Sequence, residues 1–128
     1  MTKTADQTKR IYLASPYSPV KWWQKLPVIE WIVRWLRFRA VNKVAAKLMM
    51  QGNLVFSPLS HSHPISKHCT VDPCDHDFWL RQDLWVLSVC DEMHILCLPG
   101  WEASKGIKTE MDHAEAIGLP VVMVDTDG

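Results

Sequence analysis

The stretch PGWEASKGIKTEMDHAEAIGLP, Pro99–Pro120, decides the fold expected for this chain. It follows an apolar run, Met93–Leu98, and precedes a second one, Val121–Val124. This pattern predicts a strand, a polar loop with glycines, a helix and a second strand. Serine and glycine where a helix begins suit an anion, because free backbone N–H groups point outward there. Glu110, one turn into this helix, would repel an anion, so it either has a task of its own or simply favours the helix dipole.

The same alternation of strands and helices continues upstream. The sequence predicts further strands over 10–15 and 53–57, and helices over 40–51 and 78–90. The second of these helices is apolar around much of its circumference, so we expect it to be well buried. Between them, 58–77 is expected to be a long loop, a length that is uncommon and often functional.

Alternating strands and helices predict a parallel sheet with helices on both faces. We therefore expect one domain with a three-layer, flavodoxin-like α/β fold of four or five strands. With the strand order 2-1-3-4, the loops after the first and third strands meet at the carboxyl edge of the sheet. These loops are 15–19, with the sequence SPYSP, and 99–105. A ligand site is expected between them.

A Trp-rich insertion occupies 20–38, with the sequence VKWWQKLPVIEWIVRWLRF. Apolar residues after Pro27 recur at helical spacing, with arginines on other faces. A basic, Trp-rich amphipathic stretch suits a subunit interface or lid, an ordinary core helix, or a membrane surface. It is too short and too charged to span a bilayer.

Composition narrows the class of protein. The 128 residues carry 14 basic and 14 acidic side chains, so bulk charge does not favour binding to nucleic acid or to an anionic membrane. The polar start MTKTADQTKR lacks the apolar core of a signal peptide. We therefore expect a cytoplasmic protein with reduced cysteines.

Histidines and cysteines cluster between the strand predicted over 53–57 and the helix predicted over 78–90. Their spacings match no closed zinc pattern, so no metal site is predicted. His61 or His63 is expected instead to face a ligand. The residues of the cluster are His61, His63, His68, Cys69, Cys74 and His76.

Three features together resemble the nucleoside 2-deoxyribosyltransferase-like superfamily. They are Ile11-Tyr12 at the end of a first strand, Asp83-Leu84 in a helix before the third strand, and the run from Ser104 through Gly106 to Glu110. More narrowly, the chain resembles the small bacterial and phage domains of unknown function of the DUF1937 or DUF4406 type. The resemblance covers nearly the whole chain except the Trp-rich insertion.

The resemblance implies roles for individual residues. It implies that Glu110 is a nucleophile that attacks C1′ of a deoxyribose and forms a covalent glycosyl-enzyme. It implies that Tyr12 orients this nucleophile and that Asp83 contacts the sugar or assists proton transfer to the base. Ser104 and Gly106 match positions that hold a 5′-phosphate.

Two positions differ from the superfamily pattern. The loop after the first strand lacks glycine, and Asp112 stands where a glycine is usual. The remaining substrate-binding candidates are Ser15, Tyr17 and Ser18 in the loop after the first strand, and His61 in the long loop after the second.

We therefore expect an N-glycosidase or deoxyribosyltransferase acting on a 2′-deoxynucleoside 5′-monophosphate or related nucleotide. The alternative is a non-catalytic nucleotide-binding or signalling module on the same fold. We expect no cofactor, no nucleic-acid partner and no stable membrane insertion. We do expect a homodimer or a larger homo-oligomer.

Overall fold

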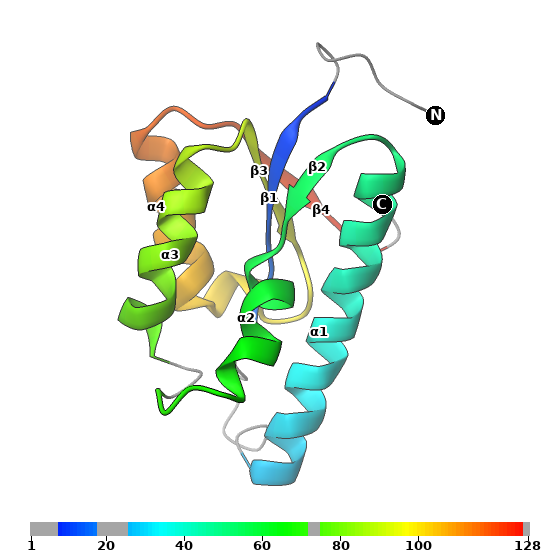
Figure 1. Cartoon of the computed structure of the whole chain (residues 1–128), viewed down its shortest axis with the longest axis vertical. Helices are drawn as coiled ribbons and strands as arrows, with labels where there is room; N and C mark the ends of the chain where they lie inside the picture. The colour runs from blue at the N-terminus through cyan, green and yellow to red at the C-terminus, as the bar shows by residue number, and fades with distance from the viewer. Residues whose placement is uncertain (1–7, 18–25, 72–74, 127–128) are drawn as a thin grey trace.

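The computed structural model describes residues 8–17, 26–71 and 75–126. They form a three-layer, flavodoxin-like α/β fold (Figure 1). Its four strands are β1 (Arg10–Ala14), β2 (Leu54–Phe56), β3 (Glu92–Leu96) and β4 (Val121–Val124). All pair in parallel in the order β2-β1-β3-β4. This confirms the predicted fold class and strand order, with strand ends that differ from the prediction by one or two residues.

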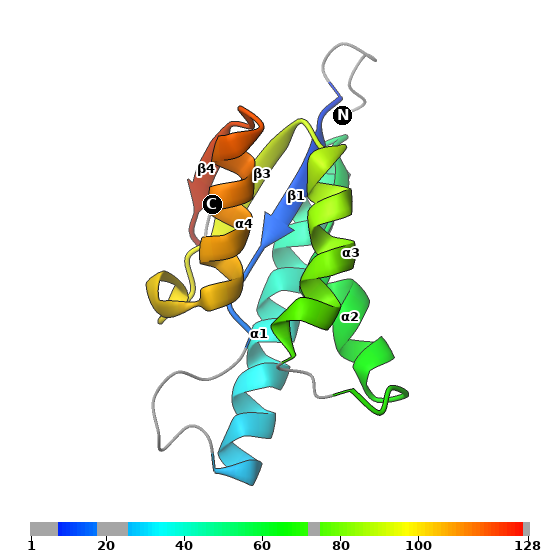
Figure 2. The same cartoon turned by 90° about the vertical axis from the view of Figure 1, so that its left-hand side faces the viewer.

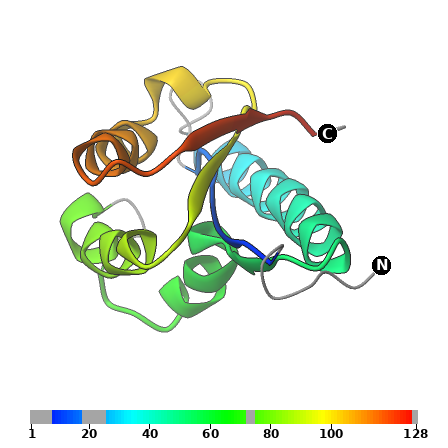
Figure 3. The ribbon, with the colours of Figure 1, turned by 90° about the horizontal axis from the view of Figure 1, so that it is seen from above.

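Helices cover both faces of the sheet. In Figure 2, α3 (His76–Ser88) and α4 (Lys105–Ala116) lie in front of the sheet, and α1 (Pro27–Met50) lies behind it. The view from above in Figure 3 shows the same separation, with a smaller helix, α2 (Pro58–Ser66), near the end of β2. A one-turn 3₁₀ helix, η2 (Trp101–Ala103), precedes α4.

Strand side chains alternate between two cores, as the period of two requires. On one face, Tyr12 and Ala14 of β1 and Met93 and Ile95 of β3 pack against α3 and α4. On the other face, Leu13 and Leu96 pack against the buried stripe of α1 and against Leu59 of α2, as the cluster of buried side chains shows. The first of these cores contains the candidate catalytic residues.

Two expectations about helices need correction. The segment 58–77 is not one long loop, because α2 occupies its first nine residues. Ser57 caps this helix by accepting a hydrogen bond from the Ser60 N–H, and Pro58 is suited to a first helical turn. This start signal was missed because the histidine-rich segment was interpreted as a loop.

The helix predicted over 78–90 begins two residues earlier and is less buried than expected. Asp75 caps it by accepting a hydrogen bond from the Phe78 N–H. Trp85 is 71% exposed, because only one side of α3 faces the sheet and α4. The expectation of a well-buried helix was therefore wrong, because some of its apolar side chains face solvent.

The Trp-rich segment and the next predicted helix form one continuous element. α1 runs without a break from Pro27, at its first turn, to Met50. Residues 18–25, which include the first part of the predicted insertion and the candidate Ser18, lie outside the described residues. Gly52, with φ of 93°, follows the helix end.

Candidate active site

The site is centred on a buried tyrosine and a buried glutamate that are far apart in the sequence. The Tyr12 hydroxyl donates a hydrogen bond to the Glu110 carboxylate. Tyr12 is fully buried and Glu110 is 6% exposed. β1 supplies the tyrosine on the face toward α3 and α4, and α4 supplies the glutamate. The two candidates that the sequence singled out for nucleophile and orienting group are therefore in direct contact.

Burial of Glu110 follows from the helical spacing of α4. Ile107, Glu110 and Ala114 are its buried residues, at intervals of three and four. Met111, by contrast, is only half-buried. A carboxylate in such a position costs free energy unless it is hydrogen bonded, which Tyr12 provides.

Asp83 is the third member of the site. It lies in the middle of α3 and is 9% exposed, although aspartate is unfavourable inside a helix. Its charge raises the pKa of both Glu110 and Tyr12. The structure thus brings Tyr12, Asp83 and Glu110 together from three different elements.

Burial controls the protonation of this group. It raises the pKa of Glu110 to about 8, against the opposing effect of the Tyr12 hydrogen bond and with a smaller rise from Asp83. Burial also raises the pKa of Asp83 to about 7. The pKa of Tyr12 lies well above its ordinary value, because of burial and then the two carboxylates. Between about pH 7 and pH 8 the two carboxyl groups therefore share about one proton, and a pair with one ionised and one protonated member can supply a base or nucleophile and an acid.

The predicted anion loop lies at the start of α4. Ser104 is the N-cap residue, and its side chain accepts a hydrogen bond from the Ile107 N–H at 3.3 Å. Gly106 is in the first turn of the same helix, one turn before Glu110. Unpaired N–H groups of this first turn can bind an anion, and the Ser104 hydroxyl proton is available to donate.

Ser15 immediately follows β1 at the carboxyl edge of the sheet. Its hydroxyl oxygen is buried and has no hydrogen-bond partner among the described residues. A buried hydroxyl without a partner costs free energy, so it suits a group that a ligand would complete. Ser15 thus remains a substrate-binding candidate, on a different basis from its loop position.

The other loop candidates lie on the β2 side of the same edge. The Tyr17 hydroxyl is 2.6 Å from His63 Nδ1, and Arg34 lies over the Tyr17 ring at 5.2 Å. His61 is exposed, with its ring 5.5 Å from Phe56, which in turn lies 5.9 Å from Tyr12. These aromatic side chains extend from the buried tyrosine toward solvent.

Arg37 supports the anion loop and was missed at the sequence level. It is 8% exposed and donates a hydrogen bond from Nη2 to the Pro99 carbonyl at 3.1 Å. Burial lowers its pKa. The burial of Arg37 could have been predicted from the sequence, because Arg37 precedes Val41, Val44 and Ala45 at the helical spacing of their buried stripe.

Asp112 is exposed on α4, so an aspartate there does not interrupt the packing of the helix. Among the residues that the structure describes, no three histidine, cysteine, aspartate or glutamate side chains group in a way that could hold a metal ion. Cys74 and the side chain of His76 are outside that description.

Comparison with known proteins places the chain in a family. No curated protein matches it. The model of a domain of unknown function, DUF1937, matches residues 9–126, which is nearly the whole chain and includes every strand and helix described above. This chain is therefore a member of the DUF1937 family.

Proposed function

We propose that this protein cleaves the N-glycosidic bond of a 2′-deoxynucleoside 5′-monophosphate or a related nucleotide. The proposal extends to membership of the nucleoside 2-deoxyribosyltransferase-like superfamily. The observation that carries it is the hydrogen bond from Tyr12 to Glu110 beside Asp83, all three buried. Buried ionisable groups with perturbed pKa values are typical of catalytic sites.

In the proposed reaction, a Glu110 carboxylate oxygen attacks C1′ of the sugar. The C1′–N bond breaks, its electron pair goes to the base, and Asp83 donates the proton that the base takes up. Water or a second base then attacks C1′, which releases Glu110 and completes hydrolysis or transfer. Tyr12 holds the attacking carboxylate by its hydrogen bond.

The phosphate of the substrate would occupy the start of α4. Gly106 lies about one turn before Glu110 and Ser104 less than two turns before it, so an anion there would present the attached sugar to the carboxylate. Ser15 at the end of β1 would bond a substrate oxygen that satisfies its buried hydroxyl. Tyr17 and His61 would line the side toward β2. The start of α4 and the Glu110 carboxylate would then bind different parts of one substrate molecule, its phosphate and its sugar.

A second candidate is a non-catalytic nucleotide-binding or signalling module. It is favoured by the pKa of Glu110, since a carboxyl group with a pKa of about 8 is mainly protonated at neutral pH and a poor nucleophile. Binding of nucleotide without release of base is the outcome that this candidate predicts. Cytoplasmic location and a homo-oligomeric state remain predictions from the sequence.

One assay tests the proposal. Purified wild type and Glu110→Ala are incubated with each 2′-deoxynucleoside 5′-monophosphate, and free base is measured by chromatography. Glu115→Ala is the matched control, because Glu115 is an exposed glutamate on the same helix. We expect release by wild type and Glu115→Ala, and a loss of at least about a thousandfold in Glu110→Ala, as for removal of other nucleophiles. Release that survives in Glu110→Ala contradicts the mechanism, and saturable binding without release supports the second candidate.

A further inference from the structure

The first half of α1 carries an apolar surface that the sheet does not cover. At 100° per residue, five of its side chains fall on one side of the helix. All five are exposed, with Val28 at 71% and Trp31 at 63%. This part of α1 extends beyond the end of the sheet (Figures 1 and 2). We call these residues the Trp stripe: Val28, Trp31, Ile32, Trp35 and Leu36.

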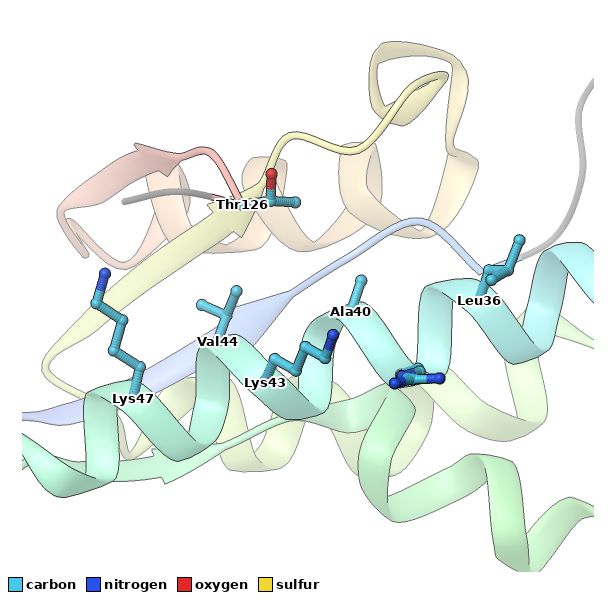
Figure 4. Close-up of a pocket in the computed structure, with 7 residues that line it drawn as sticks. Leu36, Ala40, Lys43, Val44, Lys47 and Thr126 are labelled. Atoms are coloured by element: carbon cyan, nitrogen blue, oxygen red, sulfur yellow. The ribbon is translucent and has the colours of Figure 1, made fainter.

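The Trp stripe continues into a groove along the second half of the same helix. The groove has a volume of about 550 Å³ and lies between α1 and Thr126, which follows β4. Figure 4 shows Ala40, Val44 and Lys47 projecting from α1 on the side of Thr126. We call this the cationic groove, lined by Leu36, Arg39, Ala40, Lys43, Val44, Lys47 and Thr126.

The two parts form one face with different chemistry at its two ends. Leu36 belongs to both, and Arg39, Lys43 and Lys47 follow it at intervals of three or four residues. Arg39 lies over the Trp35 ring at 5.6 Å, so the aromatic and cationic parts are in contact. Apolar and aromatic side chains thus occupy the projecting end, and cations occupy the next three turns.

Charge is distributed unevenly between α1 and the rest of the chain. α1 carries five basic residues and one glutamate, a net charge of +4. The whole chain is neutral, with 14 basic and 14 acidic residues, so the remainder carries −4. Glu30 is paired with Arg34 at 2.5 Å. The helix that bears the Trp stripe therefore has an excess of positive charge, and its exposed cations beyond the Glu30–Arg34 pair are Arg39, Lys43 and Lys47.

We propose that the Trp stripe and the cationic groove together bind the surface of an anionic phospholipid bilayer. Tryptophan favours the boundary between acyl chains and headgroups, and Lys and Arg are attracted to anionic lipid. An apolar stripe beside a row of cations meets both requirements on one helix. No helix in the described parts of the chain is long and apolar enough to cross a bilayer, so the contact is peripheral.

Charge argues against a second copy of the chain as the occupant of this face. Pairing of two α1 faces would bring two helices of net charge +4 together, and each has one glutamate, already paired with Arg34. An anionic bilayer has the complementary charge over the whole length of the face. This inference is independent of the proposed enzymatic function.

Vesicle sedimentation with the whole purified protein tests the proposal. The vesicles contain phosphatidylcholine alone or equal parts of phosphatidylcholine and phosphatidylglycerol. We expect binding only to the anionic vesicles. Raising the salt from about 0.1 M to about 1 M should weaken it strongly, because the Debye length falls from about 10 Å to about 3 Å.

Single substitutions locate the contact. Trp31→Ala should weaken binding about tenfold through lost apolar burial, and Lys43→Gln about fivefold through one lost cation. Trp85→Ala and Arg81→Gln are matched controls, because both residues are exposed on α3, on the opposite face of the sheet. They should bind like wild type, and circular dichroism verifies that all four variants are folded.

Three results would overturn the proposal. The first is absence of wild-type binding to the anionic vesicles, or equal binding to the neutral ones. The second is an equal loss of binding in the α3 controls. The third is a dimer in analytical ultracentrifugation without lipid that Trp31→Ala dissociates, which would assign the face to a second copy.

Discussion

Tyr12, Asp83 and Glu110 form a buried acidic group in which proton sharing decides what chemistry is possible. Both carboxyl pKa values are raised by burial, to about 7 for Asp83 and about 8 for Glu110. The proposed reaction needs one carboxyl ionised and the other protonated. The rate depends on pH in the same way whichever of the two carboxyl groups holds the single proton. The two pKa values therefore describe the pair and not the individual residues.

We therefore expect a bell-shaped pH profile of kcat/KM for base release, with limbs near pH 7 and pH 8 and a maximum between them. Below the lower limb both carboxyl groups are protonated, and above the upper limb both are ionised. Asp83→Asn should lower the rate and abolish one limb, because asparagine does not titrate. A profile that is flat from pH 6 to pH 9 would contradict the assignment of the pair.

At the scale of the element, α4 combines an N-cap serine, a first-turn glycine and a buried glutamate within seven residues. The cap orients the helix start, and the helix then points Glu110 toward Tyr12. The same segment therefore has a structural task and a proposed binding task. Stability and nucleotide binding must be measured together to separate the two.

Ser104→Ala separates the two tasks of this helix start. Loss of the cap should lower the free energy of unfolding by about 1 kcal/mol. Loss of a hydrogen bond to phosphate should also raise the Kd for a deoxynucleoside 5′-monophosphate about tenfold, but not the Kd for the nucleoside. Asp75→Ala is the control, since Asp75 caps α3 at the same 3.3 Å distance. It should cost similar stability and leave nucleotide affinity unchanged, and equal affinity losses in both variants would show that Ser104 is only a cap.

At the scale of the whole molecule, the buried carboxyl groups reduce stability as pH rises. The pKa of Glu110 is about 8 in the folded chain and near its ordinary value of 4.5 when unfolded. Between these values the folded state binds more protons, so the contribution of Glu110 is fully present below about pH 4.5 and is lost as pH rises through about 8.

We expect Glu110→Gln to remove this contribution to the pH dependence. Each unit of difference between folded and unfolded pKa is worth about 1.4 kcal/mol, so the variant should exceed wild type in stability by about 4 kcal/mol at pH 8, where Glu110 is about half ionised in the folded chain. The gain should shrink toward pH 5. Urea denaturation between these pH values measures it, and the exposed Glu115→Gln should show no such trend. A variant less stable than wild type at pH 8 would mean that the hydrogen bond with Tyr12 outweighs the cost of burying the charge.

Local sequence patterns were sufficient to predict the class of fold, the parallel sheet and its strand order. Short apolar runs alternating with helical patterns are local signals, and the handedness and proximity of connections limit the possible topologies. The N-caps at Ser104 and Asp75 are local features as well, because a capping side chain binds a backbone N–H within three residues. Helix α2 was missed because its histidine-rich sequence was interpreted as a loop, although Ser57 and Pro58 provide a helix start signal.

The arrangement of the candidate site, by contrast, depends on tertiary packing. The Tyr12–Glu110 hydrogen bond joins residues separated by 98 positions, and its closeness to Asp83 depends on how α3 and α4 pack on the sheet. The same packing buries Arg37 under the Pro99 carbonyl and leaves the Trp stripe exposed, although both lie on one helix. Local spacing defines which residues share a helix face. Whether that face is buried, and beside which charge, depends on the other layers of the fold.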